Sequence, residues 1–379
     1  EDQTMSMDRD VIAIAVQAGL AVFVTGPPGS GKTCWAQHGL GPALGRHVLT
    51  HICALHPPED YAGIPAPDHA AQYAPLLPVG NLKPELERYP DSIILFDDIS
   101  WATPATQAAL LRLPFERVMG EWPMPATCTF VLCKNTVEQA GGGYDIIPPL
   151  ANRALHVTWD TSDTRAWQIG MVSGWPTPQV PRLPARWRED HLLAAQVLIT
   201  GYIGSQPHKL HVEPKTPEDG GGPWPSRRSW GDLAAPMLAA CLAAGLDADT
   251  QHLAVYAAVG PVAREFAAWR HEANLPDPEE GLLHPDDYRL PERSDQQYAA
   301  LLGLVAAVRQ RTTLDRYNAA WRVVGRYLKT LRDTAAIAAS LLVQIGQEHI
   351  TEYPIPAGLK ELAPILAALR GTRGVAVTI

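Results

Sequence analysis

The stretch "GPPGSGKT", Gly26–Thr33, is the strongest indication of the fold in this sequence. It fits the phosphate-binding pattern GxxxxGK[ST], and it stands between the strand-like "AVFVT" from Ala21 and a helix-like run. The pattern requires that context, because its glycines let backbone N–H groups curl around phosphate oxygens while the helix N-terminus adds positive partial charge. A chance glycine-rich turn is the alternative, and the flanking strand and helix argue against it.

The loop also carries side chains suited to a magnesium nucleotide. Lys32 is expected to reach the outer phosphates, and the Thr33 hydroxyl to bind Mg²⁺. ATP and Mg²⁺ are therefore the expected cofactors. The residues expected to contact the nucleotide are Gly26, Pro28, Gly29, Ser30, Gly31, Lys32, Thr33 and Cys34.

A second stretch, "IILFDDIS" at Ile93–Ser100, places two acids at the end of an apolar strand. Asp97 is expected to hold Mg²⁺ through water, although an acidic strand end facing solvent would look the same. Asp98 stands where a general base would polarise the attacking water. Aspartate is one methylene shorter than glutamate, so its carboxylate falls short by about 1.5 Å. Since a misplacement of about 1 Å can cost on the order of a hundredfold in rate, we expect slow turnover rather than none.

The chain changes character along its length. From about residue 8 to 160, short β-branched or aromatic runs alternate with helix-like segments, which predicts a parallel sheet covered by helices. The predicted strands begin near Ala21, His47, Ser92, Thr129 and Ala154. A helix follows Thr103, which is a plausible N-cap before Pro104. After two Pro/Gly-rich stretches, nearly everything beyond Ser226 has the Ala/Leu-rich stripes of a packed helical bundle.

Composition narrows the function classes. The 379 residues carry 40 acids against 31 Lys and Arg, which argues against a protein that coats nucleic acid. Five cysteines form no CxxC pair, so we expect reduced, small core residues in a cytoplasmic protein. No signal-peptide pattern opens the chain, and its apolar runs are too short or too interrupted to span a membrane.

Together these motifs resemble an AAA+ ATPase, and most closely the MoxR group, which belongs to the helix-2-insert clade. The resemblance covers roughly residues 10–160 and the segment near Arg228, and residues beyond about 245 match no motif. It implies a P-loop α/β domain over residues 1–160, a helical lid with a Pro/Gly-rich insert over 161–272, and a helical C-terminal region over 273–379. It also implies a ring-forming oligomer, expected as a hexamer.

The resemblance assigns further site residues. "VLCKNT" is similar to the sensor strand, which implies that Asn135 orients water at the γ-phosphate. "PPLANRA" puts Arg153 in the arginine-finger position, although Asn152 stands where the family usually has Asp. From the residues alone, Arg153 could equally form a strand-end salt bridge. "PSRRSW" resembles the second sensor, with Arg228 as the better match and Arg227 as the alternative.

The resemblance also bears on partners. The segment from His56 to Leu86 stands where this clade inserts a loop directed at a pore or partner, and an ordinary Pro-rich surface loop is the alternative. MoxR-type proteins commonly work with a protein that carries a von Willebrand factor A domain, so such a partner is implied here.

The expected function is Mg-ATP hydrolysis coupled to remodelling of a partner protein. An ATP-held switch or scaffold that hydrolyses little is the alternative favoured by Asp98. A helicase-type motor is disfavoured by the acidic balance and by the lack of a basic patch interleaved with aromatic residues.

Overall fold

The computed structural model describes residues 6–68, 70, 73–136, 142–328 and 330–349. The chain forms two compact units, Glu1–Ala185 with His208–Glu265, and Arg186–Pro207 with Phe266–Ile379. Each unit is described by itself. None of the helices within the described ranges has the length and apolarity that a membrane crossing needs. The three domain boundaries drawn from the sequence remain predictions.

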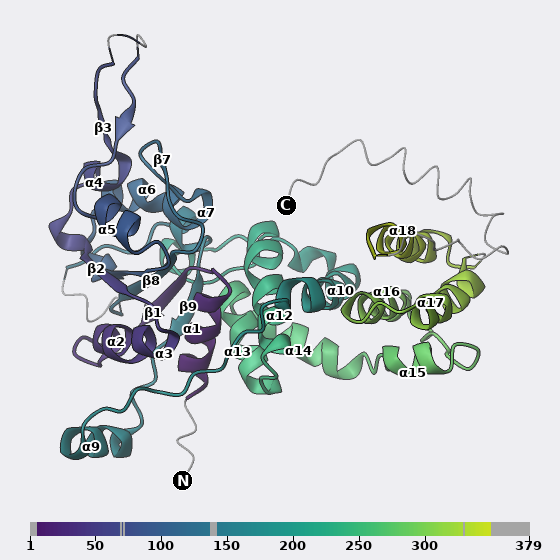
Figure 1. The fold of residues 1–379 in the computed structure, drawn as a ribbon. Coiled ribbons are helices and arrows are strands. Elements are labelled where there is room, and N and C mark those ends of the chain that lie inside the picture. The colour runs from purple at the N-terminus through teal and green to yellow at the C-terminus, as the bar shows by residue number, and fades with distance from the viewer. Residues whose placement is uncertain (1–5, 69, 71–72, 137–141, 329, 350–379) are drawn as a thin grey trace. The chain divides into compact units, whose positions relative to one another are not determined.

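The first unit is built on a five-stranded sheet in the order β2-β5-β8-β1-β9 (Figure 1). Every neighbouring pair in this sheet is parallel. The strands are β1 (Val22–Thr25), β2 (Val48–Ile52), β5 (Ile93–Asp97), β8 (Thr129–Lys134) and β9 (Leu155–Thr158). The predicted α/β class and all five predicted strands are confirmed.

Helices cover both faces of this sheet, as parallel strands require. On one face α1 (Met7–Gln17) contacts β1, β8 and β9, and it buries the continuous run from Val11 to Val16. The other face packs into a core that includes Phe96 of β5 and Phe130 of β8, whose rings stack 6.3 Å apart. The near-continuous apolar β5 sequence follows from this, because both of its faces are buried.

The helix predicted after Thr103 is present as α6 (Pro104–Ala109), η4 (Leu110–Arg112) and α7 (Leu113–Glu116). The Thr103 hydroxyl accepts a hydrogen bond from the Thr106 N–H at 3.2 Å, as an N-cap does. The run ends at Arg117, which has a left-handed backbone (φ 51°) and donates to the Gly19 and Cys128 carbonyls. Cys128 directly precedes β8 and Gly19 lies three residues before β1, so α7 ends at the edge of the sheet where these strands begin.

The predicted insert is more ordered than a Pro-rich surface loop. It contains α4 (Glu59–Ala62), the antiparallel pair β3 (Ile64–Pro65) and β4 (Leu76–Leu77), and α5 (Leu82–Arg88). Figure 1 shows the β3–β4 hairpin projecting from the sheet. A second short hairpin, β6 (Val118–Met119) with β7 (Trp122–Pro123), lies against it through the hydrogen bond from the Glu121 N–H to the Leu76 carbonyl.

The later part of the chain is helical, as predicted. The remaining helices of the first unit are η2 (Cys53–Leu55), η3 (Ile99–Trp101), α8 (Pro148–Ala151), α9 (Thr164–Ser173), η6 (Pro207–Lys209), α11 (Pro217–Gly220), η7 (Ser229–Ala234), α12 (Ala235–Ala243) and α13 (Ala248–Val259). The second unit holds α10 (Trp187–Ser205), α15 (Pro278–Leu283), α16 (Ser294–Gln310), α17 (Leu314–Tyr327) and α18 (Arg332–His349), and α14 (Val262–Glu272) joins the two units.

One prediction about the cysteines is wrong. Four of the five are buried, as small core residues should be, but Cys34 is exposed. Cys34 directly follows the phosphate-loop motif and lies in the short helix α2 (Lys32–Trp35), where Gly31 before it is exposed as well. Its place at the start of this exposed turn therefore overrides the general burial tendency of cysteine.

Candidate nucleotide site

The phosphate loop follows β1 and turns sharply into a helical run. Gly29 (φ 73°) and Gly31 (φ 90°) both have left-handed backbones, which a side chain would strain. The run starts with α2 and continues through the π-helical η1 (Ala36–Leu40) to α3 (Gly41–Leu44). The loop therefore presents the alternating backbone that makes an anion-binding concavity, at the start of a helix.

Lys32 is folded into this loop. Its ammonium donates to the carbonyls of Gly26 at 2.8 Å and Pro27 at 2.7 Å, and to the side-chain oxygen of Asn135 at 3.3 Å. Burial lowers the pKa of Lys32, while Asp97 is among the negative groups that partly restore it. The cation is thus held at the base of the loop with acidic neighbours.

The two predicted magnesium ligands are in direct contact. The Thr33 hydroxyl donates to Asp97 Oδ2 at 2.9 Å. Mg²⁺ in nucleotide sites is commonly bound by one or two protein oxygens, with waters and phosphates completing its shell. No group of three or more His, Cys, Asp or Glu suited to a metal occurs in the described ranges, so a cage made of protein alone is not found there. The pair fits a nucleotide-bound Mg²⁺.

Asp98 takes an unusual backbone conformation directly after the β5 strand. It has a left-handed backbone (φ 51°, ψ 42°), which aspartate tolerates better than most residues. Its N–H donates to Asp97 Oδ1 at 3.0 Å, and its own Oδ1 lies 3.4 Å from Asn135 Nδ2. Asn135 is in turn held by its backbone N–H, which donates to the Ser100 hydroxyl at 3.3 Å.

The strand order explains how these side chains meet. β8 lies between β1 and β5, so Asn135, directly after β8, stands between Lys32 of the loop and Asp98 of the acidic strand end. The carboxyl ends of parallel strands share one edge of a sheet, and ligands of open α/β sheets bind there. Three residues predicted from separate motifs are therefore joined by hydrogen bonds, and Thr33 and Asp97 lie beside them.

The arginine pair lies elsewhere on the first unit. Arg153 stands between α8 and β9, two residues before the strand begins, and it donates to the Pro149 carbonyl at 2.6 Å. The Arg228 guanidinium lies 5.4 Å from the centre of the Phe115 ring. Burial lowers the pKa of Arg153, and the positive charge of Arg228 lowers it further. Arg153 and Arg228 therefore lie near enough for their charges to interact.

This pair and the phosphate loop occupy opposite edges of the sheet. Arg153 precedes β9, whereas Gly26 follows the parallel neighbour β1. A four-residue strand separates the two edges by about 13 Å. Arg227, the alternative to Arg228, is exposed. The structure thus groups the predicted site residues into two clusters rather than one.

Asn152 links the arginine segments to each other. Its side-chain amide donates to the Trp224 carbonyl at 3.2 Å, and its oxygen accepts from the Ser226 hydroxyl at 2.7 Å. Asn152 is buried, and the Ser226 backbone N–H also donates to the Ser229 hydroxyl at 2.7 Å. Aspartate could not replace this donor, which gives a physical reason for asparagine here.

Lys134 makes a second tie from the sheet to the segment that leads to Arg228. It ends β8, and its ammonium donates to the Gly221 carbonyl at 3.1 Å. Burial, offset in part by the negative charge of Asp145, lowers the pKa of Lys134 to about 8. The Arg228 segment is therefore fixed to the sheet at two places.

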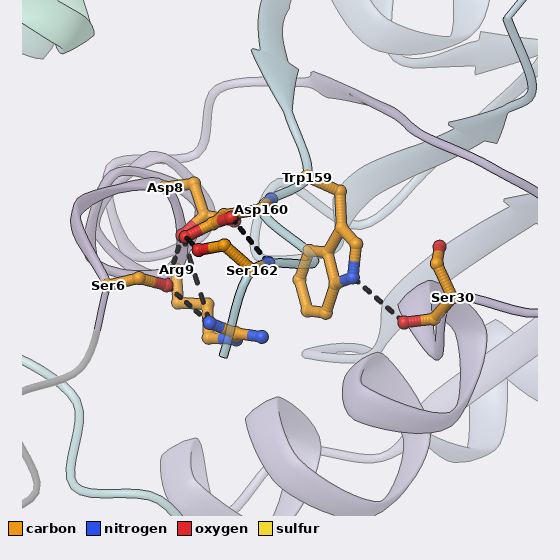
Figure 2. Close-up of polar contacts among 7 residues, drawn as sticks. All are labelled: Ser6, Asp8, Arg9, Ser30, Trp159, Asp160 and Ser162. Atoms are coloured by element: carbon orange, nitrogen blue, oxygen red, sulfur yellow. Dashed lines mark hydrogen bonds and ion pairs between the residues drawn. The ribbon is translucent and has the colours of Figure 1, made fainter. Parts of the chain in front are cut away.

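Sequence reasoning missed a cluster beside the phosphate loop, drawn in Figure 2. Trp159 directly follows β9, and its indole N–H donates to the Ser30 carbonyl at 3.0 Å. The Arg9 guanidinium lies 4.4 Å from the centre of the same ring. The sequence signal that could have found this cluster is the position of Trp159 at the end of a predicted strand. Residues at the carboxyl ends of parallel strands gather at one edge of the sheet.

Comparisons with known proteins give distant likenesses. No protein-family model matches the chain, and no curated protein matches it. Similar solved structures include a "putative ATPase" from Cytophaga hutchinsonii (15% identity, 67% of this chain and 80% of that chain, TM-score 0.41). NtrX from Brucella abortus in complex with ATP covers 91% of this chain and 69% of its own (14% identity, TM-score 0.29).

A third similar structure is the genome packaging NTPase B204 from Sulfolobus turreted icosahedral virus 2, in complex with ATP-gammaS. It shares 16% identity over 41% of this chain and 83% of that chain, with a TM-score of 0.22. Likenesses at these scores assign neither a family nor an activity to the chain.

Proposed function

We propose that this chain is an AAA+ ATPase that binds Mg-ATP at the carboxyl-end edge of its sheet and hydrolyses it. The observation that supports this proposal is the hydrogen-bonded series Lys32–Asn135–Asp98, with the Thr33–Asp97 pair beside it. These are the residue types that phosphoryl transfer needs: a cation for the phosphates, oxygens for the metal, and a base with an orienting amide.

Each residue has a distinct role in the proposed reaction. Lys32 places positive charge on the outer phosphates, and the loop amides bind their oxygens. Asp98 accepts a proton from the attacking water, while Asn135 fixes the direction of that water. Thr33 and Asp97 would hold Mg²⁺, which neutralises charge on the phosphate oxygens when it is bound.

The direct test measures ATP affinity and phosphate release in the same variants. Lys32→Ala should abolish tight ATP binding and turnover, because it removes the cation aimed at the outer phosphates. Lys83→Ala is the matched control, since Lys83 lies in α5, outside the site, is half-buried and pairs with Glu87 at 3.8 Å. A wild-type chain that neither binds nor cleaves ATP would overturn the proposal.

We also propose that each active site is completed by a second subunit. Arg153 and Arg228 lie at the edge opposite to the phosphate loop, so they face away from their own nucleotide. A head-to-tail contact between copies would bring this arginine pair to a neighbour's phosphates, and repetition of such a contact closes into a ring. A rigid, permanently charged guanidinium stabilises the charge that develops on the transferred phosphoryl group.

A second candidate function is an ATP-held switch. The short side chain of Asp98 favours this candidate, because its carboxylate reaches about 1.5 Å less far than that of a glutamate. A single-turnover measurement compared with steady-state phosphate release separates the two candidates. A switch retains unhydrolysed ATP over many minutes, whereas a motor turns it over continuously.

We propose, from the resemblance to MoxR proteins, that hydrolysis remodels a partner with a von Willebrand factor A domain. The projecting β3–β4 hairpin is a suitable contact, since it exposes the apolar side chains of Ile64 and Leu77. Deleting the whole of Pro57–Asp68 would remove Tyr61, a core residue, so the hairpin needs a smaller change.

The hairpin can be shortened without touching the core. The Ala66 N–H donates to the Pro75 carbonyl at 3.0 Å, so Asn-Gly in place of residues 67–74, with Pro75→Thr to supply the N–H that the turn needs, would close a tight turn there. ATP affinity should be retained and capture of the partner by an ATP-loaded Asp98→Asn chain should fall. Equal capture with the short hairpin would exclude it as the contact.

A further inference from the structure

The phosphate loop is anchored by a residue from the far end of the α/β fold. Trp159 is 5% exposed, and its indole N–H reaches the Ser30 carbonyl at 3.0 Å from 129 positions away in the sequence (Figure 2). The two ends of the loop both meet this residue, because a Cβ added at Gly26 would lie 3.0 Å from the Trp159 Cβ.

The geometry of the peptide unit determines how this hydrogen bond orients the loop. All described peptide bonds are trans, so the Ser30 carbonyl and the Gly31 N–H of one peptide unit point in opposite directions. A hydrogen bond that holds the Ser30 carbonyl toward Trp159 therefore turns the Gly31 N–H toward the opposite side, into the loop. Gly31 can rotate freely on its own, since glycine populates left- and right-handed backbones about equally.

Trp159 is itself held on several sides. The Arg9 guanidinium lies 4.4 Å above its ring, and the ring of Trp35 lies 5.4 Å away. The next residue is fixed as well, because the Asp160 N–H donates to Asp8 Oδ2 at 2.9 Å. Asp8 is buried near the start of α1. The anchor therefore belongs to a rigid cluster formed by α1 and the end of β9.

We propose that Trp159 is a positioning residue that preorganises the Gly31 N–H for phosphate binding. The inference rests on the proposed function, because it assigns the loop to the phosphates of ATP. When the Gly31 N–H is already oriented, nucleotide binding does not have to order the loop and loses less conformational entropy. Loss of the anchor therefore weakens nucleotide binding and leaves the chemical step intact.

The test compares the wild-type chain with two variants at this position. One is Trp159→Phe, and the other carries β-(3-benzothienyl)alanine, which keeps the shape of the double ring but has sulfur in place of the N–H. Loss of one hydrogen bond should raise the Kd for ATP and ADP by about three- to tenfold in both. The KM should rise by the same factor, while kcat should change by less than about twofold.

Trp122→Phe is the matched control, because it makes the same change in β7, outside the phosphate loop and the cluster that holds Trp159, and should leave the Kd within about twofold. Unchanged ATP affinity in the benzothienyl chain would overturn the inference, since it would show that the ring acts through packing alone. A fall in kcat with constant KM would overturn it as well. The wild-type titration tests the proposed function separately, because only its failure shows that no nucleotide binds.

Discussion

Asn135 connects the phosphate loop to the proposed general base: its side-chain oxygen accepts from Lys32 at 3.3 Å, and its amide nitrogen lies 3.4 Å from Asp98 Oδ1. This arrangement fixes the orientation of the amide, because Lys32 can only donate and a carboxylate can only accept. The contact also shows how the short side chain of Asp98 reaches the position proposed for the base. The left-handed backbone of Asp98 turns its carboxylate toward Asn135, which directly follows the central strand β8.

Substitutions of Asp98 test this relationship. Asp98→Asn should keep ATP affinity and lower kcat by about a hundredfold or more, because an amide cannot accept the proton of water. Asp98→Glu should not raise turnover, since one more methylene moves the carboxylate about 1.5 Å past the position already set by the backbone. Single-turnover phosphate release measures both. Faster cleavage by the Glu variant would show instead that the native arm is too short.

Local sequence patterns predicted the strands, the phosphate loop and the acidic strand end, because each is specified by neighbouring residues. The Thr103 cap was predictable for the same reason. The strand order was not predicted, so the place of Asn135 at the γ-phosphate came only from the resemblance, and its contacts with Lys32 and Asp98 were not predicted. Long-range contacts left no local signal either. The Trp159 anchor crosses 129 positions, and no periodicity marks such a pair.

Asn152, which stands where the family usually has Asp, connects its own segment to the Arg228 segment. Its amide donates to the Trp224 carbonyl, and its oxygen accepts from the Ser226 hydroxyl. The departure from Asp is therefore compensated by the neighbouring segment. A motif comparison could not reveal this, because the partner of Asn152 lies 72 positions away.

Asn152→Asp, the change toward the family residue, should destabilise the chain. A buried carboxylate would face the Trp224 carbonyl without a donor, which costs about 1–3 kcal/mol. Denaturant unfolding at pH 7 measures the loss, and Asn274→Asp, at an exposed position, should change stability by less than about 0.5 kcal/mol. The loss of stability in Asn152→Asp should become smaller toward pH 5, because the protonated carboxyl group can donate to the Trp224 carbonyl again. Equal stability of the two variants would contradict the proposed network.

Asp10 gives a prediction about pH. Burial, together with the negative charges of Asp8 and Asp247, raises the pKa of Asp10 from 3.8 to about 6. The charged form is therefore disfavoured in the folded chain, so the penalty is present above pH 6 and is relieved as the pH falls from about 6 to about 4. Asp10→Asn should raise the free energy of unfolding by about 1 kcal/mol at pH 8.

The same variant should lose most of this advantage at pH 4.5, where native Asp10 is largely protonated. Asp287→Asn is a suitable control, because Asp287 is exposed and should show no comparable pH-dependent gain. A constant difference between Asp10→Asn and the native chain from pH 4.5 to 8 would mean that the substitution acts through packing rather than charge.

Subunit mixing tests whether the arginine edge serves a neighbour. Arg153→Ala should bind ATP normally but lose turnover on the order of a thousandfold, as loss of an arginine finger does. Lys32→Ala should lose its own site but keep its arginine edge. If the contact is head-to-tail, an equal mixture should recover about a quarter of wild-type activity, because that share of contacts pairs an intact site with an intact arginine.

Two measurements make the mixing result decisive. A mixture of Arg153→Ala with the double variant Lys32→Ala/Arg153→Ala should stay inactive, since no intact arginine is supplied. The specific activity of the wild-type chain should rise with protein concentration, together with ATP-promoted light scattering. Concentration-independent hydrolysis by a monomer would contradict the proposal, because the active site would then be complete within one subunit. The proposal expects the opposite, since one strand length of about 13 Å separates the arginine pair from the phosphate loop of its own subunit.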